Sequence, residues 1–300
     1  EGYSRDEAGN MVAALSRIGD EAAMAAIEEY AEAFGADVQG AAVEAWPQFE
    51  AQEYSRRVLS RVLRDGRLHV YDQPDVSGEH IGAMPEGLTD LVLTGLGGIR
   101  GEDLRLLPRG LPRLYLQFLS AVCGEHIGLL PPGLVSLGLR ALPGDFGQHL
   151  RLLPEGLREL VLRDLSVGYG ARLQSLPQGL EGLAIKDVDG LSDGGLQGLP
   201  EGLGDLRLER LEGVCGEDLQ LLPARLQSLT LIDFPGLRGH DLHHLLRLQY
   251  LRSLELRSLP QVRSLAALIP LAEQLVRVQV RPLPDDIEIP PELEAIIVRE

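Results

Sequence analysis

The chain is poor in several residue types that mark other classes of protein. Its 300 residues include only two cysteines, Cys123 and Cys215, and a single lysine, Lys186, while aromatic residues make up 4%. Two cysteines are too few for a disulfide framework and favour a reducing, cytoplasmic compartment. Because aromatic rings are so scarce, the core must be built from Leu, Val, Ile and Ala, which indicates closely spaced, regular stacking.

Long apolar runs and an excess of positive charge are also missing. No apolar segment reaches the roughly 18 residues that a membrane-spanning helix needs, and the N-terminus lacks a signal-peptide pattern. The formal net charge is −17, and such a balance opposes sequence-independent binding of nucleic acid or of an anionic membrane. We therefore expect a protein partner.

Known catalytic motifs are absent as well. A phosphate-binding loop needs GxxxxGK[ST], but Lys186 lies in Ala184-Ile-Lys186-Asp187, with no glycine before it and no hydroxyl after it. The sequence contains no HExxH zinc helix. We expect no catalytic residue, cofactor or metal in this chain, and hence no enzyme.

A 23-residue repeat dominates the sequence. Its prolines stand at positions 85, 108, 131, 154, 177, 200 and 223, and its frame is LPxGLxxLxL. The LxL pair has the period of a β-strand, which predicts that Leu91 and Leu93 point inward while Asp90, Val92 and Thr94 face outward. Each repeat should therefore contribute one short strand, and we expect about eleven in total.

The second half of each repeat carries groups such as Gly101-Glu-Asp-Leu104 and Gly216-Glu-Asp-Leu219. Acidic residues suit the unpaired N–H groups at the start of a short helical turn. This half therefore predicts short helices or 3₁₀ turns on the outer face. The longer runs at 239–250 and 262–275 predict fuller helices there.

The repeat resembles the leucine-rich-repeat family over residues 65–300, with LxxLxL as the specific motif. The resemblance implies an α/β solenoid of about 10–11 repeats, with a parallel sheet on the concave face and short helices or 3₁₀ turns on the convex face. Where that family places an inward asparagine, this chain has apolar residues, namely Leu96, Leu119, Leu142, Leu165, Val188, Leu211 and Phe234. An asparagine ladder is therefore absent.

Residues 1–64 lack the repeat and have helical spacing, which predicts three or four helices separated at Gly35-Ala-Asp37 and Pro47. Through Trp46-Pro-Gln-Phe49 and Glu53-Tyr-Ser-Arg-Arg57, this segment resembles the HEAT-type helices that run into leucine-rich arrays in bacterial NACHT (STAND-type) signalling NTPases. The alternative is a cap that covers the end of the solenoid core.

The resemblance implies a noncatalytic sensor arm of a larger bacterial antiviral-defence (innate-immunity) protein, whose ATPase and effector domains lie outside this chain. Two alternatives remain open. The chain is a structural scaffold or autoinhibitory arm that contacts upstream domains of its own parent protein, or it is the substrate-binding repeat region of a bacterial ubiquitin-ligase effector, a family that also carries LPxGL repeats.

The candidate binding surface lies at the outward strand positions. The position after each LxL pair holds Thr94, Gln117, Arg140, Arg163, Lys186, Glu209, Ile232, Arg257, Arg281 and Arg299. Like charges on adjacent strands repel, so three consecutive basic residues in an acidic protein predict a site for an acidic partner surface. The predicted contacts are Arg113, Tyr115, Gln117, Arg140, Arg163, Lys186, Arg207, Arg257 and Arg281.

Alternative interpretations of these side chains remain. Glu159, Asp164 and Asp187 could neutralise the basic column, leaving a merely solvated strand edge. Phe118 either extends the binding surface or belongs to the core. Among possible metal ligands, the histidines of His240-Asp-Leu-His243-His244 could share a helix face, and His126 and His149 occupy equivalent repeat positions; a capping or solvated role is the alternative. Cys123 and Cys215 are interpreted as small, partly buried residues.

Overall fold

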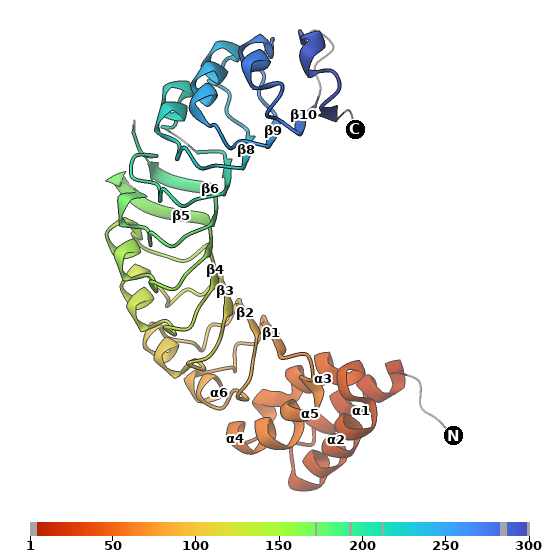
Figure 1. Cartoon of the computed structure of the whole chain (residues 1–300). Coiled ribbons are helices and arrows are strands. Elements are labelled where there is room, and N and C mark those ends of the chain that lie inside the picture. The colour runs from red at the N-terminus through yellow and green to blue at the C-terminus, as the bar shows by residue number, and fades with distance from the viewer. Residues whose placement is uncertain (1–4, 172, 192–193, 212, 283–286, 299–300) are drawn as a thin grey trace. The chain divides into compact units, whose positions relative to one another are not determined.

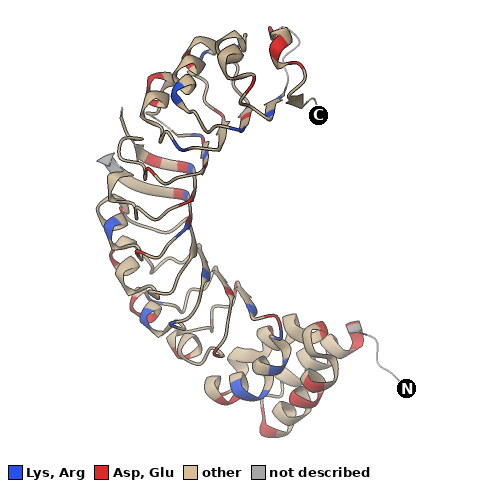
Figure 2. Ribbon diagram, viewed as in Figure 1, with Lys and Arg blue, Asp and Glu red and all other residues tan. Residues whose placement is uncertain are grey.

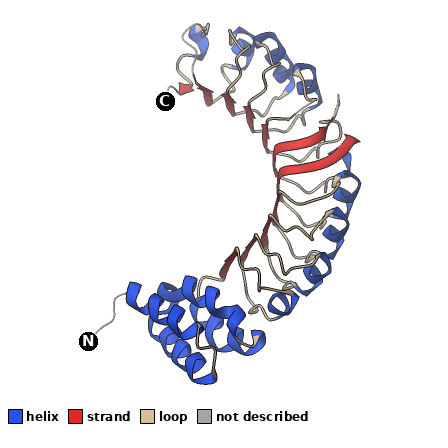
Figure 3. Cartoon of the chain, turned by 180° about the vertical axis from the view of Figure 1, so that it is seen from behind, coloured by secondary structure: helices blue, strands red, loops and turns tan. Residues whose placement is uncertain are grey.

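A computed structural model describes residues 5–171, 173–191, 194–211, 213–282 and 287–298 (Figure 1). The chain forms two compact units, Glu1–Pro143 and Gly144–Glu300. In each unit, parallel strands lie on one side and short helical turns on the other (Figure 3). No helix among the described residues is both long and apolar enough to cross a membrane.

The first unit begins with the predicted helices. They are α1 (Arg5–Ser16), α2 (Glu21–Phe34), α3 (Gln39–Ala45), α4 (Ala51–Tyr54) and α5 (Ser60–Val62), with a π-helical turn at Ser55–Leu59 that joins the last two. The side chain of Asp20 accepts a hydrogen bond from the Ala23 N–H, 2.8 Å away, which fixes the start of α2. Gly35, with φ of 54°, ends that helix. The two predicted helix breaks are confirmed.

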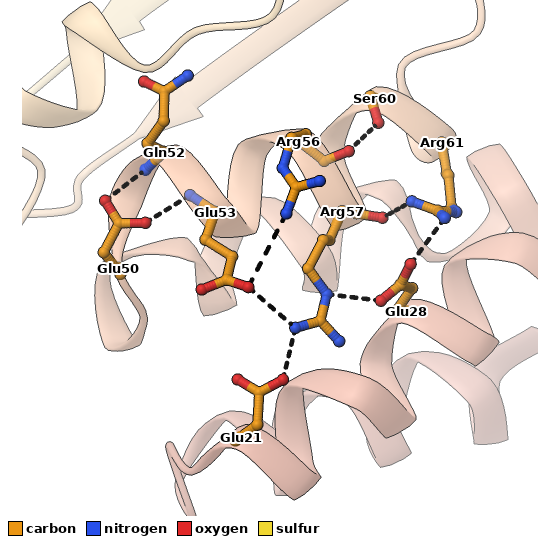
Figure 4. A network of polar contacts seen from close by, with 9 residues as sticks. All are labelled: Glu21, Glu28, Glu50, Gln52, Glu53, Arg56, Arg57, Ser60 and Arg61. Atoms are coloured by element: carbon orange, nitrogen blue, oxygen red, sulfur yellow. Dashed lines mark hydrogen bonds and ion pairs between the residues drawn. The ribbon is translucent and has the colours of Figure 1, made fainter.

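An ion-pair network around Arg57 links the π-helical turn to α2 (Figure 4). Its Nε lies 2.6 Å from Glu28 Oε2 and its Nη1 lies 2.6 Å from Glu21 Oε1, both on α2. Nη1 also lies 3.3 Å from Glu53 Oε1. Because the Arg57 side chain is only 16% exposed, these charge-assisted contacts are less screened than surface pairs.

The helical segment packs directly on the first repeat. The ring of Trp46 meets the ring of His80 edge-on, with centroids 5.2 Å apart, and both side chains are buried. Gln39 Nε2 also donates to the Arg67 carbonyl oxygen, 2.8 Å away. These helices therefore close the apolar end of the repeat stack in this unit.

Strands in the first unit are β1 (Arg67–Tyr71), β2 (Asp90–Thr94), β3 (Arg113–Gln117) and β4 (Ser136–Arg140), each paired in parallel with the next. The register steps by 23 residues, so that Leu91 pairs with Leu114 and Leu114 with Leu137. All three leucines are fully buried. The predicted inward and outward alternation is confirmed.

The second unit continues the same plan with strands that include two longer ones. They are β5 (Glu159–Ala171), β6 (Gly182–Leu191), β7 (Asp205–Glu209), β8 (Ser228–Ile232), β9 (Ser253–Arg257), β10 (Arg277–Arg281) and β11 (Ile297–Val298). Neighbours pair in parallel. The length of β5 and β6 was not predicted, because the second half of these repeats lacks the Gly-Glu-Asp-Leu start of a helical turn. The eleven expected strands are present among the described residues.

Helical turns return the chain between strands. They are α6 (Gly78–Gly82) and the 3₁₀ turns η4 (Gly101–Leu106), η5 (Gly124–Leu129), η6 (Gly147–Leu152), η7 (Leu173–Ser175), η8 (Gly216–Leu221), η9 (Gly239–Arg247), η10 (Ala266–Leu271) and η11 (Pro291–Leu293). The prediction of fuller helices at 239–250 and 262–275 is wrong, since both runs form 3₁₀ turns. At Ala266–Leu271 the cause includes Pro270, which has no N–H to continue an α-helix.

The Gly-Glu-Asp-Leu group performs two structural tasks. Asp103 Oδ2 accepts the Arg100 N–H at 2.8 Å, which satisfies the backbone ahead of the turn. The same carboxylate fills the space above Gly78 of the preceding repeat, where an added Cβ would lie 2.2 Å from Asp103 Oδ1. The His126 ring fills the equivalent space above Gly101. Glycine at this position therefore makes room for the next repeat.

Candidate functional site

A backbone feature recurs directly after the outward position at the end of each LxL pair. There the residue adopts a left-handed conformation, with φ between 47° and 66°, at Asp72, Gly95, Phe118, Ala141, Asp164, Asp187, Arg210, Asp233 and Ser258. Gly and Asp enter this region most easily, while a bulky side chain is disfavoured. Phe118 and Arg210 are the two bulky side chains of this series, and a non-glycine residue in such a conformation costs about 1–3 kcal/mol.

Phe118 is also exposed, which answers the question that the sequence left open. Its side chain is 48% exposed, and the Arg140 guanidinium lies over its ring with Cζ 4.9 Å from the centroid. Three residues earlier on β3, the ring of Tyr115 covers Gly138, where an added Cβ would approach Tyr115 Cε1 to 2.3 Å. The stacked pair Phe118 and Arg140, together with Tyr115 of the same strand, is here called the aromatic corner.

The outward positions around the aromatic corner are mixed in character. Arg113 Nε lies 3.2 Å from Asp90 Oδ2 on the neighbouring strand, and both side chains are partly exposed. Gln117 is half-buried between Thr94 and Arg140, its partners in the strand register. Tyr71 is 51% exposed at the end of β1. The sheet face of this unit therefore carries both aromatic and charged side chains.

In the second unit a buried carboxylate organises the basic residues. Glu209 has a side chain only 7% exposed and pairs with both Lys186 and Arg207, the latter at 3.1 Å. Burial alone would raise the pKa of Glu209, but hydrogen bonds from Lys186 and Arg207 outweigh it and hold that pKa below its usual value. The positive charge of Lys186 is therefore compensated by the carboxylate of Glu209.

Other members of the basic column also have acidic partners. Arg163 Nε lies 3.6 Å from Asp164 Oδ2, and Arg257 pairs with Glu255 on its own strand. Arg281 is half-buried at the end of β10, and Arg299 lies outside the described residues. Figure 2 shows basic and acidic residues next to one another on β5 and β6. The second unit thus presents alternating charges along its sheet face.

Arg210 and Asp187 form an ion pair with two hydrogen bonds next to the basic column. Two nitrogens of Arg210 donate to the two oxygens of Asp187, at 2.7 and 2.8 Å. These bonds lower the pKa of Asp187. Both residues occupy the recurring left-handed position. The pair was not predicted, although its members stand 23 residues apart in the repeat register.

A shallow hollow of about 380 Å³ lies on the sheet face of the second unit. Its floor is formed by small outward residues, including Val161, Gly182 and Ala184, and its walls include Arg158 and Arg207. The hollow exists because adjacent strands place small side chains next to one another. It can accept a protruding side chain of a partner.

Among the histidines considered as metal ligands, the structure gives contacts for His126, His240 and His243. The run at 240–244 lies in a 3₁₀ turn with three residues per turn, so His240 and His244 do not share a face as they would in an α-helix. His243 Nδ1 instead lies 2.6 Å from the His240 carbonyl oxygen. His126 Nδ1 accepts the Cys123 N–H at 3.2 Å.

Both cysteines are free thiols, Cys123 half-buried and Cys215 exposed. Burial raises the pKa of both thiols, and nearby carboxylates add to the effect. Catalytic thiols have lowered pKa values, because the thiolate is the nucleophile. Neither cysteine therefore has the electrostatic surroundings of a nucleophile.

No family model and no curated protein matches the sequence. Solved structures that resemble the chain are leucine-rich-repeat proteins. The protein LegL7 from Legionella pneumophila is 14% identical with a TM-score of 0.38, covering 76% of this chain and 98% of that one. An internalin (inlF) from Listeria monocytogenes is 16% identical with a TM-score of 0.45, covering 74% and 77%. Internalin C2 from the same organism is 17% identical with a TM-score of 0.42, covering 80% and 92%. Similarities this distant carry no information on function.

Proposed function

We propose that the chain is a noncatalytic protein-recognition module that binds an acidic partner surface on its sheet face. The observation that carries the proposal is Phe118, a half-exposed aromatic residue in a strained left-handed conformation beneath Arg140. A large aromatic side chain that is half-exposed in a disfavoured backbone conformation is best explained by a contact made outside the chain. Tyr and Arg, its neighbours here, are enriched at the centres of protein interfaces.

The second unit supplies the remaining proposed contacts, Arg163, Lys186, Arg207, Arg257 and Arg281. An acidic partner must compete there with Asp164, Glu209 and Glu255, each already paired with a basic side chain. Such a pattern adds little affinity, but it rejects partners whose charges do not match. The aromatic corner of the first unit is therefore the surface that we propose supplies affinity, and the charged face of the second unit is proposed as a separate, selective contact.

The finer proposal is that the module is the sensor region of a larger cytoplasmic NACHT-type protein in bacterial defence. Its support is the resemblance of the Trp46-Pro-Gln-Phe49 and Glu53-Tyr-Ser-Arg-Arg57 segments to HEAT-type helices, and a cap on the repeat stack is the alternative. The proposal requires ATPase and effector domains in the parent protein. Expressing the parent protein with and without F118N would test it, since loss of trigger-induced activation is expected only if the sheet face senses the trigger.

A peptide-display selection tests the recognition function without a known partner. A random peptide library is panned on the immobilised chain, with binders of the F118N/R140Q variant removed first. We expect enriched peptides in which Asp or Glu adjoins a large apolar side chain, since these complement Arg140 and the aromatic rings. A library that yields no enrichment, or yields basic peptides, contradicts the proposal.

A further inference from the structure

We propose that Cys123, Glu125 and His126 form a binding site for a thiophilic divalent cation, with Zn²⁺ as the ion that best suits its ligands. This inference is independent of the proposed recognition function, because the three residues lie at the start of the turn η5 and not on the sheet face. Thiolate, imidazole and carboxylate are the three ligand types that zinc takes from proteins.

Distances within the cluster fit one ion. Cys123 Sγ lies 3.2 Å from His126 Nδ1 and 3.6 Å from Glu125 Oε1, and one ligand atom from each of the three residues lies within 4.8 Å of the others. Zn–S bonds of about 2.3 Å and Zn–N or Zn–O bonds of about 2.0 Å in a tetrahedron place ligand atoms about 3.3–3.6 Å apart. The side chains need only small rotations to reach this geometry, and water completes the coordination.

Packing against the preceding repeat holds the ring of His126 in place without an ion. The ring lies above Gly101 of the preceding repeat, in space that a Cβ would need. The Cys123 N–H donates to Nδ1, which assigns the lone pair to Nδ1 and the ring proton to Nε2. Nδ1 is therefore a ready ligand on the side of the sulfur. To bind at Nδ1, the ion must displace the contacts that this nitrogen makes with the Cys123 N–H and the Cys123 sulfur, each at 3.2 Å.

Electrostatic surroundings also suit a cation. The negative charges of Glu125 and of Glu102 in the preceding repeat both act on the Cys123 sulfur. Because a thiolate is the ligand, binding of the ion releases the thiol proton to solvent. The ion would relieve the repulsion between the thiolate and both carboxylates.

The equivalent positions in two other repeats each differ from the cluster at one ligand. Ser77 and His80 stand where Cys123 and His126 do, at the same 3.2 Å separation. Cys215 and Asp218 form the corresponding pair in the second unit, with the same capping arrangement. Within the described ranges, only the Cys123 group brings three potential ligand residues within 4.8 Å of one another. These two pairs show that a turn of this chain can begin with Ser in place of Cys123 or with Asp in place of His126.

The test titrates the full chain with Zn²⁺ alone by calorimetry, and with Co²⁺ by absorption spectroscopy. The variants are C123S, which reproduces the Ser77 and His80 pair, and H126D, which reproduces the Cys215 and Asp218 pair, so both keep a cap that already folds here. We expect one site that releases protons, a sulfur-to-cobalt charge-transfer band, and at least about tenfold weaker binding in either variant. C215S, the matched control, should bind as the unsubstituted chain does.

Each other outcome overturns the proposal. Equal Zn²⁺ affinity in the unsubstituted chain and in folded C123S would assign binding to other residues. A charge-transfer band that persists in C123S but vanishes in C215S would place the ligand sulfur in the second unit. The absence of any saturable binding would leave the cluster with its capping role alone.

Discussion

Arg140 holds its guanidinium over the ring of Phe118, with Cζ 4.9 Å from the ring centroid. The pair joins β4 to the residue that follows β3, and it stabilises an aromatic side chain that the backbone disfavours, since φ at Phe118 is 54°. Strain and stacking thus oppose each other at one exposed position. The net contribution of Phe118 to stability should accordingly be small.

F118N separates recognition from stability. Asn enters the left-handed region readily, so the relief of strain offsets the lost stacking, and the free energy of unfolding should stay unchanged or rise by up to about 1 kcal/mol. Thermal melts measure this. The matched control is L119A, which removes a fully buried neighbour and should cost about 2–5 kcal/mol. A loss of more than about 1 kcal/mol in F118N would show that Phe118 is a structural residue.

Leu160 tests the stacked core of the second unit. It is 1% exposed on β5 and pairs in register with Leu183 of the next repeat. L160A leaves a void that both neighbouring repeats share, so unfolding should be easier by about 2–5 kcal/mol. V161A, on the outward side of the same strand, is the control and should cost under about 1 kcal/mol. Denaturant titration of both variants checks the difference.

Glu209 should stabilise the second unit in a pH-dependent way. E209Q leaves Lys186 and Arg207 without their shared carboxylate, at an expected cost of about 1–3 kcal/mol at neutral pH after allowing for the exposure of both basic side chains. Since the native pKa of Glu209 lies below its ordinary 4.5, this contribution is present above pH 4.5 and is lost as pH falls through the native pKa.

Denaturant melts between pH 3 and pH 7 measure this dependence. The difference between the unsubstituted chain and E209Q should shrink on acidification. E181Q removes a carboxylate from an exposed pair with Arg158 and should change stability by less than about 1 kcal/mol throughout. Equal effects of E209Q and E181Q would show that burial adds nothing to the Glu209 cluster.

His80 should make the first unit sensitive to mild acid. Burial lowers its pKa from the ordinary 6.5, although Glu79 and Asp75 oppose the shift. The unfolded chain therefore binds a proton that the folded unit rejects, and stability should fall as pH drops below about 6.5. In H80N an amide oxygen can still accept the Ser77 N–H. If thermal melts of H80N lose as much stability on acidification as those of the unsubstituted chain, His80 is not the cause of the acid sensitivity.

The sequence predicted the parallel strands, the 23-residue register and the buried leucines, because the period of the LxL pair leaves one face for the core. It also located the helix breaks at Gly35 and Pro47. The longer strands β5 and β6 escaped prediction, since their second halves are defined by pairing with each other and not by a local turn signal.

Much less of the candidate site was predictable. The sequence placed Arg140 and Tyr115 on the outward face, but it could not show that Phe118 is exposed, since a left-handed residue reverses the alternation. The ion pairs of Glu209 were within reach, because Lys186 and Glu209 occupy the same repeat position 23 residues apart. The Cys123 cluster depends on side-chain rotamers at the start of a turn, which spacing alone does not determine.

The affinity of a display-selected acidic peptide for the sheet face tests the central claim most directly. Calorimetry compares the unsubstituted chain with Y115A/F118N/R140Q and with the control L106Q/L129Q, which changes exposed leucines on the helical-turn side of the same unit. We predict at least about tenfold weaker binding in the first variant and unchanged binding in the control. Unchanged binding in a folded Y115A/F118N/R140Q, or its loss in L106Q/L129Q, would contradict recognition through the sheet face.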